Sequence, residues 1–293
     1  MKVTKISQQW GLLLFCFLLL GIQPAKAQKP PFKVGKVSPE DFTLYQQAND
    51  TSAAAVVLSD FGTSYFRRMG NNFKLVYERT IRIHVLKKEG YDYANVEIPY
   101  YVGRSSKDRE SVHKVEGYSH NLVDGKVVTE RIHKKKNMFD EDAHELYKQR
   151  KFSIPNVREG AIIEYTYQIT SPHFVNFKSW YFQKDIPVLR SEYYVSIPSF
   201  FNYLKLFQGY KKFAVNEQSK SSMAFGSRSF NSINYRWVQE DVPAFKKEKY
   251  IASPSDHIVK MEFQLASIAF PGQPVQEILG SWESMTKSFL EDN

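Results

Sequence analysis

The sequence predicts a mainly β protein, built as an antiparallel β-sandwich or as a strongly curved two-sheet domain, with minor short helices. Segments between the glycines and prolines alternate apolar and polar residues, which is typical of strands with one buried face. No long helical pattern separates these segments, so a parallel βαβ sheet is not expected. Half-buried antiparallel strands cover their apolar faces by packing two sheets together.

The clearest alternation covers residues 73–86. Its odd-numbered positions are apolar except for Arg79, and its even-numbered positions are mostly polar. At about 3.3 Å per residue this strand could reach roughly 45 Å, enough to bend or to serve two sheets. We therefore expect Ile81 and Ile83 to be buried and Arg82 to be exposed, so that Arg82→Ala changes stability by at most about half a kcal/mol.

Two further segments, 161–170 and 259–265, alternate in the same way. Tyr165 and Phe263 should be buried, whereas Thr166 and Glu262 should face solvent. Shorter strands are expected at residues 54–59, 94–100, 191–197 and 234–238.

Residues 111–132 predict a hairpin around Asp124-Gly125, a dipeptide that accepts positive φ in a tight turn. If these two residues form the loop, His120 lies opposite Thr129 and His133 lies opposite Glu116. No histidine then opposes another across the hairpin.

Short helices are expected at residues 140–148 and at the C-terminus. Near the C-terminus, Trp282, Met285 and Phe289 recur with the spacing of an amphipathic helix. This helix either packs back on the sandwich or is the first element of a further domain, and we favour the second interpretation.

The N-terminus predicts a cleaved signal peptide at residues 1–27. A basic start is followed by an apolar run of about a dozen residues, too short to span a bilayer comfortably. The segment ends in Ala25-Lys26-Ala27, a typical cleavage site before Gln28. The mature protein is therefore expected to be exported, periplasmic or extracellular, without a transmembrane segment.

The remaining chain divides into a tether at residues 28–50, a β-sandwich at 51–270, and a linker with the start of a helix at 275–293. The single cysteine, Cys16, is lost with the signal, which excludes a disulfide, a cysteine zinc site and a cysteine nucleophile. Removing Lys2, Lys5 and Lys26 reduces the formal charge from +9 to 9 − 3 = +6. An exported basic protein meets anionic lipids and acidic polysaccharides, so nucleic acid is not an expected partner.

No motif in the sequence predicts catalysis. The seven histidines lack the spacing that places two imidazoles on one metal, and we interpret them as exposed surface residues. The acidic run that begins at Asp140 favours a helix N-terminus over a Ca²⁺ loop. No glycine-flanked serine elbow and no phosphate-binding loop occur. The basic run 133–136 is interpreted as a solvated loop or edge strand. We therefore predict no enzyme and no catalytic, cofactor-binding or metal-binding residue.

Aromatic residues make up 15% of the chain and often stand in adjacent pairs, such as Tyr193-Tyr194 and Phe200-Phe201. In a strand each pair puts one ring inside and one outside. Such rings could stack on sugars, which makes glycan binding a possible function, but aromatic residues are also ordinary strand and core residues.

Taken together, short segments in a fixed order resemble the domain of unknown function that precedes the transglutaminase-like core in exported bacterial proteins. The segments are 50–60, 80–90, 151–160, 163–167, 180–183, 186–187, 235–237, 242–244 and 248–250. The resemblance implies a mainly β domain followed by a papain-like core with a Cys-His-Asp triad, and it carries no catalytic residue into this sequence.

The leading functional hypothesis is therefore a non-catalytic exported β-domain. It would be the N-terminal accessory region of a transglutaminase-like protein and position the core or its substrate, with the downstream core as its intramolecular partner. The alternative is a self-sufficient envelope module that binds a glycan or a peptide.

Overall fold

The computed structural model describes residues 28–279, apart from residues 49, 51, 71, 176, 211, 226–227 and 247–256. The expected signal peptide at 1–27 and the expected helix around Trp282 lie outside the described residues. The described chain is mainly β, which confirms the predicted fold class. Its helical segments are short: η1 (Pro39–Gln47), η2 (Lys88–Ala94), η3 (Ser106–Asp108) and α2 (Lys134–Asn137). No helix in these ranges is long and apolar enough to cross a membrane.

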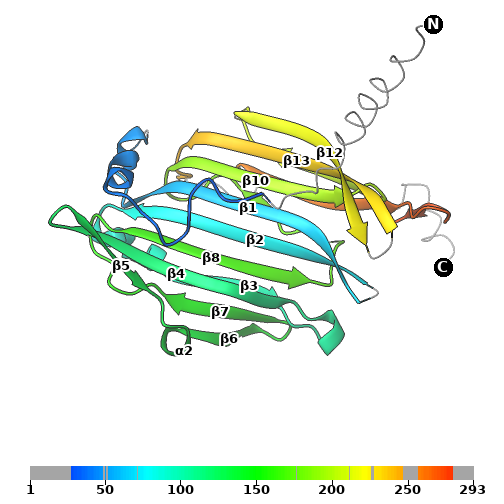
Figure 1. The fold of residues 1–293 in the computed structure, drawn as a ribbon, viewed down its shortest axis with the longest axis horizontal. Helices are drawn as coiled ribbons and strands as arrows, with labels where there is room; N and C mark the ends of the chain where they lie inside the picture. Colours follow the sequence, from blue (N-terminus) through cyan, green and yellow to red (C-terminus); the bar gives the residue numbers. More distant parts are fainter. Residues whose placement is uncertain are drawn as a thin grey trace, which may run out of the picture.

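A twisted eight-stranded sheet forms the larger layer (Figure 1). In spatial order its strands are β12 (Val215–Phe225), β13 (Arg228–Val242), β10 (Val188–Pro198), β1 (Ala55–Met69), β2 (Asn72–Val85), β8 (Ile162–Ser171), β4 (Ser111–Val123) and β5 (Lys126–Arg131). Neighbouring strands are antiparallel except β1 and β10, which run parallel. That parallel pair departs from the purely antiparallel arrangement that the sequence predicts.

Two smaller sheets cover one face of this layer. The first contains β11 (Phe201–Gln208), β14 (Lys260–Ile268), β15 (Gln276–Glu277) and β9 (Trp180–Tyr181), and the second contains β3 (Asn95–Tyr101), β7 (Tyr147–Ser153) and β6 (Met138–His144). Trp180 stacks on Tyr193 of the large sheet with ring centroids 4.9 Å apart. Phe152 of β7 meets Tyr165 of β8 edge to face at 6.2 Å. These contacts between the layers form the main core of a sandwich.

The alternating sequence of strand β2 determines which of its residues enter this core. Ile81 and Ile83 are buried beneath the smaller sheets, as the alternation predicts. Phe263 of β14 is also buried, whereas Tyr165 is only partly so. On the opposite face the prediction for Arg82 is wrong, because its side chain is only 5% exposed.

The opposite face of β2 is buried because residues 28–48, here called the N-terminal arm, lie across it (dark blue in Figure 1). Phe42 of η1 packs with Val56, Leu58 and Ile162 in a second apolar cluster on this outer face. The stretch expected as a tether therefore includes a segment that packs on the sandwich.

The hairpin of β4 and β5 confirms the predicted turn. Asp124 and Gly125 both have positive φ, 49° and 73°, as a two-residue hairpin loop of the I′ type requires. His120 lies opposite Thr129, as expected from this turn.

Residues 140–148 do not form the expected helix. They belong to β6, to the turn at 145–146 and to β7, and Asp140 receives two hydrogen bonds from Arg150 across this strand pair, at 2.8 and 2.7 Å. The acidic run is therefore satisfied by a basic residue on the next strand, and the helix-cap interpretation is wrong. The basic run, expected as a loop or edge strand, contains the four-residue helix α2.

Candidate functional site

A groove of about 800 Å³ opens at the edge of the sandwich between the large sheet and the sheet of β11 and β14. We call it the edge groove. Its lining residues come from β11, β12, β13, β14 and the loop after β11: Lys205, Phe207, Lys212, Phe213, Asn216, Gln218, Tyr235, Trp237 and Met261. The edge groove is therefore lined by strands of both sheets.

The wall of the edge groove is aromatic. Tyr235 and Trp237 are two residues apart on β13, so their side chains share a face, and their rings stack at 5.3 Å with an interplanar angle of 3°. Phe207 and Phe213 meet opposite them with centroids 4.4 Å apart. Trp237 is fixed from behind by Phe263 at 5.9 Å. Trp237 is only 4% exposed, so it backs the wall, and the partly buried Tyr235 is the ring of this pair that is open to the groove.

Lysines border the same opening. Lys205 Nζ lies 4.7 Å from the centre of the Tyr235 ring, within cation–π range. Lys212 and Lys220 are exposed, and Lys220 shares the groove-facing side of β12 with Asn216 and Gln218. No aspartate or glutamate lines the edge groove among the residues that the structure describes. The opening is therefore positively charged.

These residues are suited to binding a ligand rather than to catalysing a reaction. Aromatic faces stack on flat or apolar groups, the amides of Asn216 and Gln218 donate and accept hydrogen bonds, and lysines attract anions. Among the described residues, the lining contains no serine, threonine, cysteine or histidine, so this part of it offers no nucleophile paired with an imidazole base.

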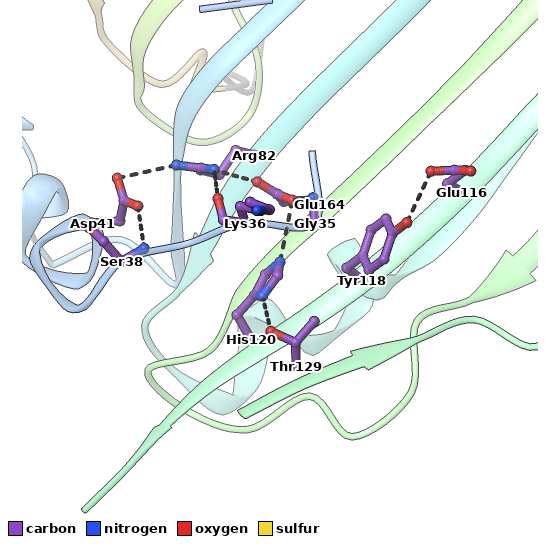
Figure 2. Close-up of polar contacts among 10 residues, drawn as sticks. All are labelled: Gly35, Lys36, Ser38, Asp41, Arg82, Glu116, Tyr118, His120, Thr129 and Glu164. Carbon is purple, nitrogen blue, oxygen red and sulfur yellow. Dashed lines mark hydrogen bonds and ion pairs between the residues drawn. The ribbon is translucent and has the colours of Figure 1, made fainter. Parts of the chain in front are cut away.

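A second polar constellation lies under the N-terminal arm, where Figure 2 shows Arg82 and His120 converging on Glu164. Arg82 Nε donates to Glu164 Oε1 at 2.6 Å, and His120 Nε2 lies 3.3 Å from Glu164 Oε2. The Gly35 amide of the arm also donates to Oε2, at 2.6 Å. The side chains of Glu164 and His120 are 0% exposed. A His-Glu pair suggests acid–base chemistry, but this one is sealed from substrate and joins the arm to the sheet.

A third cluster lies on the face of the large sheet that meets the smaller sheets. Arg79 and Lys184 bind Asp60 at 2.8 and 2.7 Å. Burial alone would raise the pKa of Asp60, but the two cations outweigh it and hold that pKa below its usual value. Burial lowers the pKa of Lys184, whose Nζ also donates to the Tyr181 carbonyl. Every charge of this cluster is used within the core, so we assign it a structural role.

The histidines follow the surface interpretation only in part. His84 and His120 are buried, at 2% and 0% exposure, because the N-terminal arm covers the polar face on which they lie. The described part of the chain contains no cluster of three or more histidine, cysteine, aspartate or glutamate side chains that could hold a metal ion. The sequence does not single out the edge groove, although the alternation of residues 234–238 places Tyr235 and Trp237 on one face.

Comparison with known proteins adds a family and a fold. The model of a family described as "Domain of Unknown Function with solved-structure structure (DUF3857)" matches residues 71–246. A crystal structure of a "putative protease" from Parabacteroides distasonis is similar with a TM-score of 0.54 and 14% identity, over 73% of this chain and 41% of that chain. A "putative nutrient binding protein" from Legionella pneumophila has a TM-score of 0.29 and 8% identity, over 73% of this chain and 68% of that chain. No curated protein matches the sequence. The chain thus spans less than half the length of the Parabacteroides protein.

Proposed function

Because the chain belongs to the DUF3857 family of domains of unknown function, we propose that it is a non-catalytic accessory β-domain. It would be exported to the periplasm or beyond and would belong to a larger protein with a transglutaminase-like core. In that protein it would position the core or hold the substrate beside it. The core, on the same polypeptide, would be its partner.

The edge groove is the observation that carries this proposal. It combines a rigid aromatic wall with amides and with lysines that form no ion pair with described residues, and its described lining lacks a nucleophile with an imidazole base. In the two buried clusters, His120 already contacts Glu164 and Lys184 already binds Asp60, so neither side chain is available to a substrate. Chemistry would then have to come from another part of the protein.

The difference in length from the Parabacteroides structure supports the same proposal. That chain has more than half of its length outside the shared fold, so the fold occurs there beside further structure. For the present protein, the resemblance of its sequence to domains that precede a transglutaminase-like core supports a further part of that class.

Intact mass spectrometry of the protein from its native host tests the architecture. We expect an N-terminus at Gln28 and a mass larger than that of residues 28–293. A retained Met1 would contradict export with cleavage, and a polypeptide that ends at Asn293 would contradict the attached core.

An activity measurement tests the non-catalytic assignment. The purified chain should release neither ammonia from glutamine peptides nor fragments from peptide substrates. Turnover that is lost in Lys205→Gln, but kept in a Lys126→Gln control on the distant β5, would place catalysis in the edge groove and contradict the proposal.

The alternative is a self-sufficient envelope module that binds a glycan or a peptide. The partly exposed ring of Tyr235, held in place by stacking on the buried Trp237, favours it, since aromatic rings bind sugar rings as well as apolar side chains. A native protein without a core, together with saturable ligand binding by this chain, would favour this alternative over the accessory domain.

A further inference from the structure

We propose that the outer edge of β11 binds an extended acidic peptide, which adds as a further strand at the opening of the edge groove. This inference deepens the proposed function by naming the class of partner. It rests on the proposed function only in treating the bound peptide as a segment held for a catalytic core. The binding itself does not depend on such a core.

Strand β11 is the terminal strand of its sheet. It pairs with β14 on one side, and no described strand pairs with its other side. An edge of this kind presents backbone N–H and C=O groups to an incoming strand. Such edges bind extended peptides by main-chain hydrogen bonds, while the side chains of the peptide provide the specificity.

The two faces of β11 differ in chemistry. Leu204 and Leu206 point away from the core and are 47% and 49% exposed, whereas Lys205 and Phe207 line the edge groove. Side chains of an added strand would lie beside those of β11 on each face, about 4.5–5.5 Å apart. Residues of the peptide on the outer face would therefore meet leucines, and those on the inner face would meet the groove.

Charge selects the residues on the inner face. Lys205, Lys212 and Lys220 form no ion pair with any residue that the structure describes. No described carboxylate lines the groove to neutralise them. An added strand with acidic residues facing inward and aliphatic residues facing outward would match both faces. The peptide recognised by this edge should therefore alternate acidic and aliphatic residues.

The edge favours a peptide over an acidic glycan. A sugar could stack on Tyr235 and meet the lysines, but it would not form the ladder of main-chain hydrogen bonds that a peptide strand forms along β11. It would also leave Leu204 and Leu206 exposed. A strand of peptide uses all three features.

Fluorescence anisotropy with a labelled peptide of alternating Glu and Val, eight residues long to match β11, tests the proposal. Binding should be saturable. It should weaken at least tenfold when alternate backbone nitrogens that face the edge are methylated, in whichever of the two registers weakens it more. It should also weaken when salt rises from about 0.05 to about 0.5 M. A Lys/Val peptide of the same pattern should not bind.

Protein variants locate the site. Lys205→Glu with Lys212→Glu should weaken binding at least tenfold, and Leu204→Lys with Leu206→Lys should do the same by charging the edge. Val128→Lys, an exposed residue on the distant edge strand β5, is the matched control and should bind as the unaltered protein does. Circular dichroism should show that all variants keep the β fold.

Three results would overturn the proposal. Methylated and unmethylated peptides could bind equally, which would exclude strand addition. An oligogalacturonate could bind where the peptide does not, which would assign the groove to an acidic glycan. A dimer that Leu204→Lys with Leu206→Lys abolishes, without peptide binding, would assign the edge to a second copy of the chain.

The outcomes separate this inference from the proposed function. Peptide binding by a native protein without a core would contradict the accessory role and keep the strand addition. A native protein with an active core, but no peptide binding by this edge, would keep the accessory role and refute the strand addition.

Discussion

The edge groove and the face beneath the N-terminal arm both collect charged and aromatic side chains, yet they use them differently. Under the arm, Glu164 binds Arg82, His120 and the Gly35 amide, and the side chains of Glu164 and His120 are fully buried. In the edge groove, Lys205 lies over the Tyr235 ring, and no carboxylate among the described residues pairs with it.

This difference separates residues that hold the fold from residues available to a ligand. Burying a charge is costly unless it is paired and hydrogen-bonded, so removing one partner of a buried cluster leaves the other charge unsatisfied. An exposed cation over an aromatic ring contributes little to stability and can exchange its solvent for an anion. Substitutions in the first region should therefore change the free energy of unfolding, and those in the second should change binding.

The largest effect is expected for Arg82→Ala. It leaves Glu164 buried without its guanidinium partner and should cost about 3–5 kcal/mol in the free energy of unfolding, measured with urea. This replaces the small effect that the sequence alone predicts. Arg131→Ala, which removes a surface ion pair with Glu116, is the control and should cost about 1 kcal/mol or less. Equal costs would contradict a structural role for the covered cluster.

Ile83→Ala should destabilise nearly as much, by about 2–5 kcal/mol, because it opens a cavity between the layers. Leu204→Ala removes a similar side chain from the exposed face of β11 and should change stability by about half a kcal/mol at most. Thermal or urea unfolding of both variants checks the pair. A cost for Leu204→Ala that matches that of Ile83→Ala would mean that the edge strand belongs to the core.

Gly62→Ala should cost about 1–3 kcal/mol through overpacking. A Cβ at this position would lie 2.1 Å from Cζ3 of Trp180, whose ring is held against Tyr193. The indole must therefore move, and tryptophan fluorescence should shift along with the lower unfolding midpoint. An unchanged spectrum and midpoint would show that the layers yield at this contact.

The smallest effect on stability is expected in the edge groove. Lys205→Gln should change the free energy of unfolding by no more than about half a kcal/mol, because the lysine is exposed and has no ion-pair partner among the described residues. The same variant should weaken binding of the acidic peptide. A large loss of stability would instead place Lys205 with the structural charges.

The sequence predicts where the strands lie, but it does not predict which segments of the chain cover their faces. Alternation finds β2 and correctly buries Ile81 and Ile83. It also identifies the polar face, but it does not show that another segment covers that face, and Arg82 and His84 are buried for this reason. The residues of the arm that bury them are roughly forty positions away in the chain, so only the tertiary arrangement brings them together.

The edge groove could not be predicted from the sequence for a related reason. Lys205 and Tyr235 lie on strands of different sheets, and their contact depends on how those sheets pack. The local sequence pattern is also misleading at residues 140–148, where a short acidic run predicts the start of a helix but the structure contains two strands. The pairing of Asp140 with Arg150 on the neighbouring strand explains this run better.

The central claim is that β11 and the edge groove bind a ligand while the arm-covered face holds the fold. Hydrogen–deuterium exchange, with and without saturating Glu/Val peptide, tests it most directly. We predict slower exchange for backbone amides of residues 201–208 and unchanged exchange in β4, β5 and the N-terminal arm. Exchange in β11 that stays the same, or protection that appears around His120 and Glu164 instead, would contradict the claim.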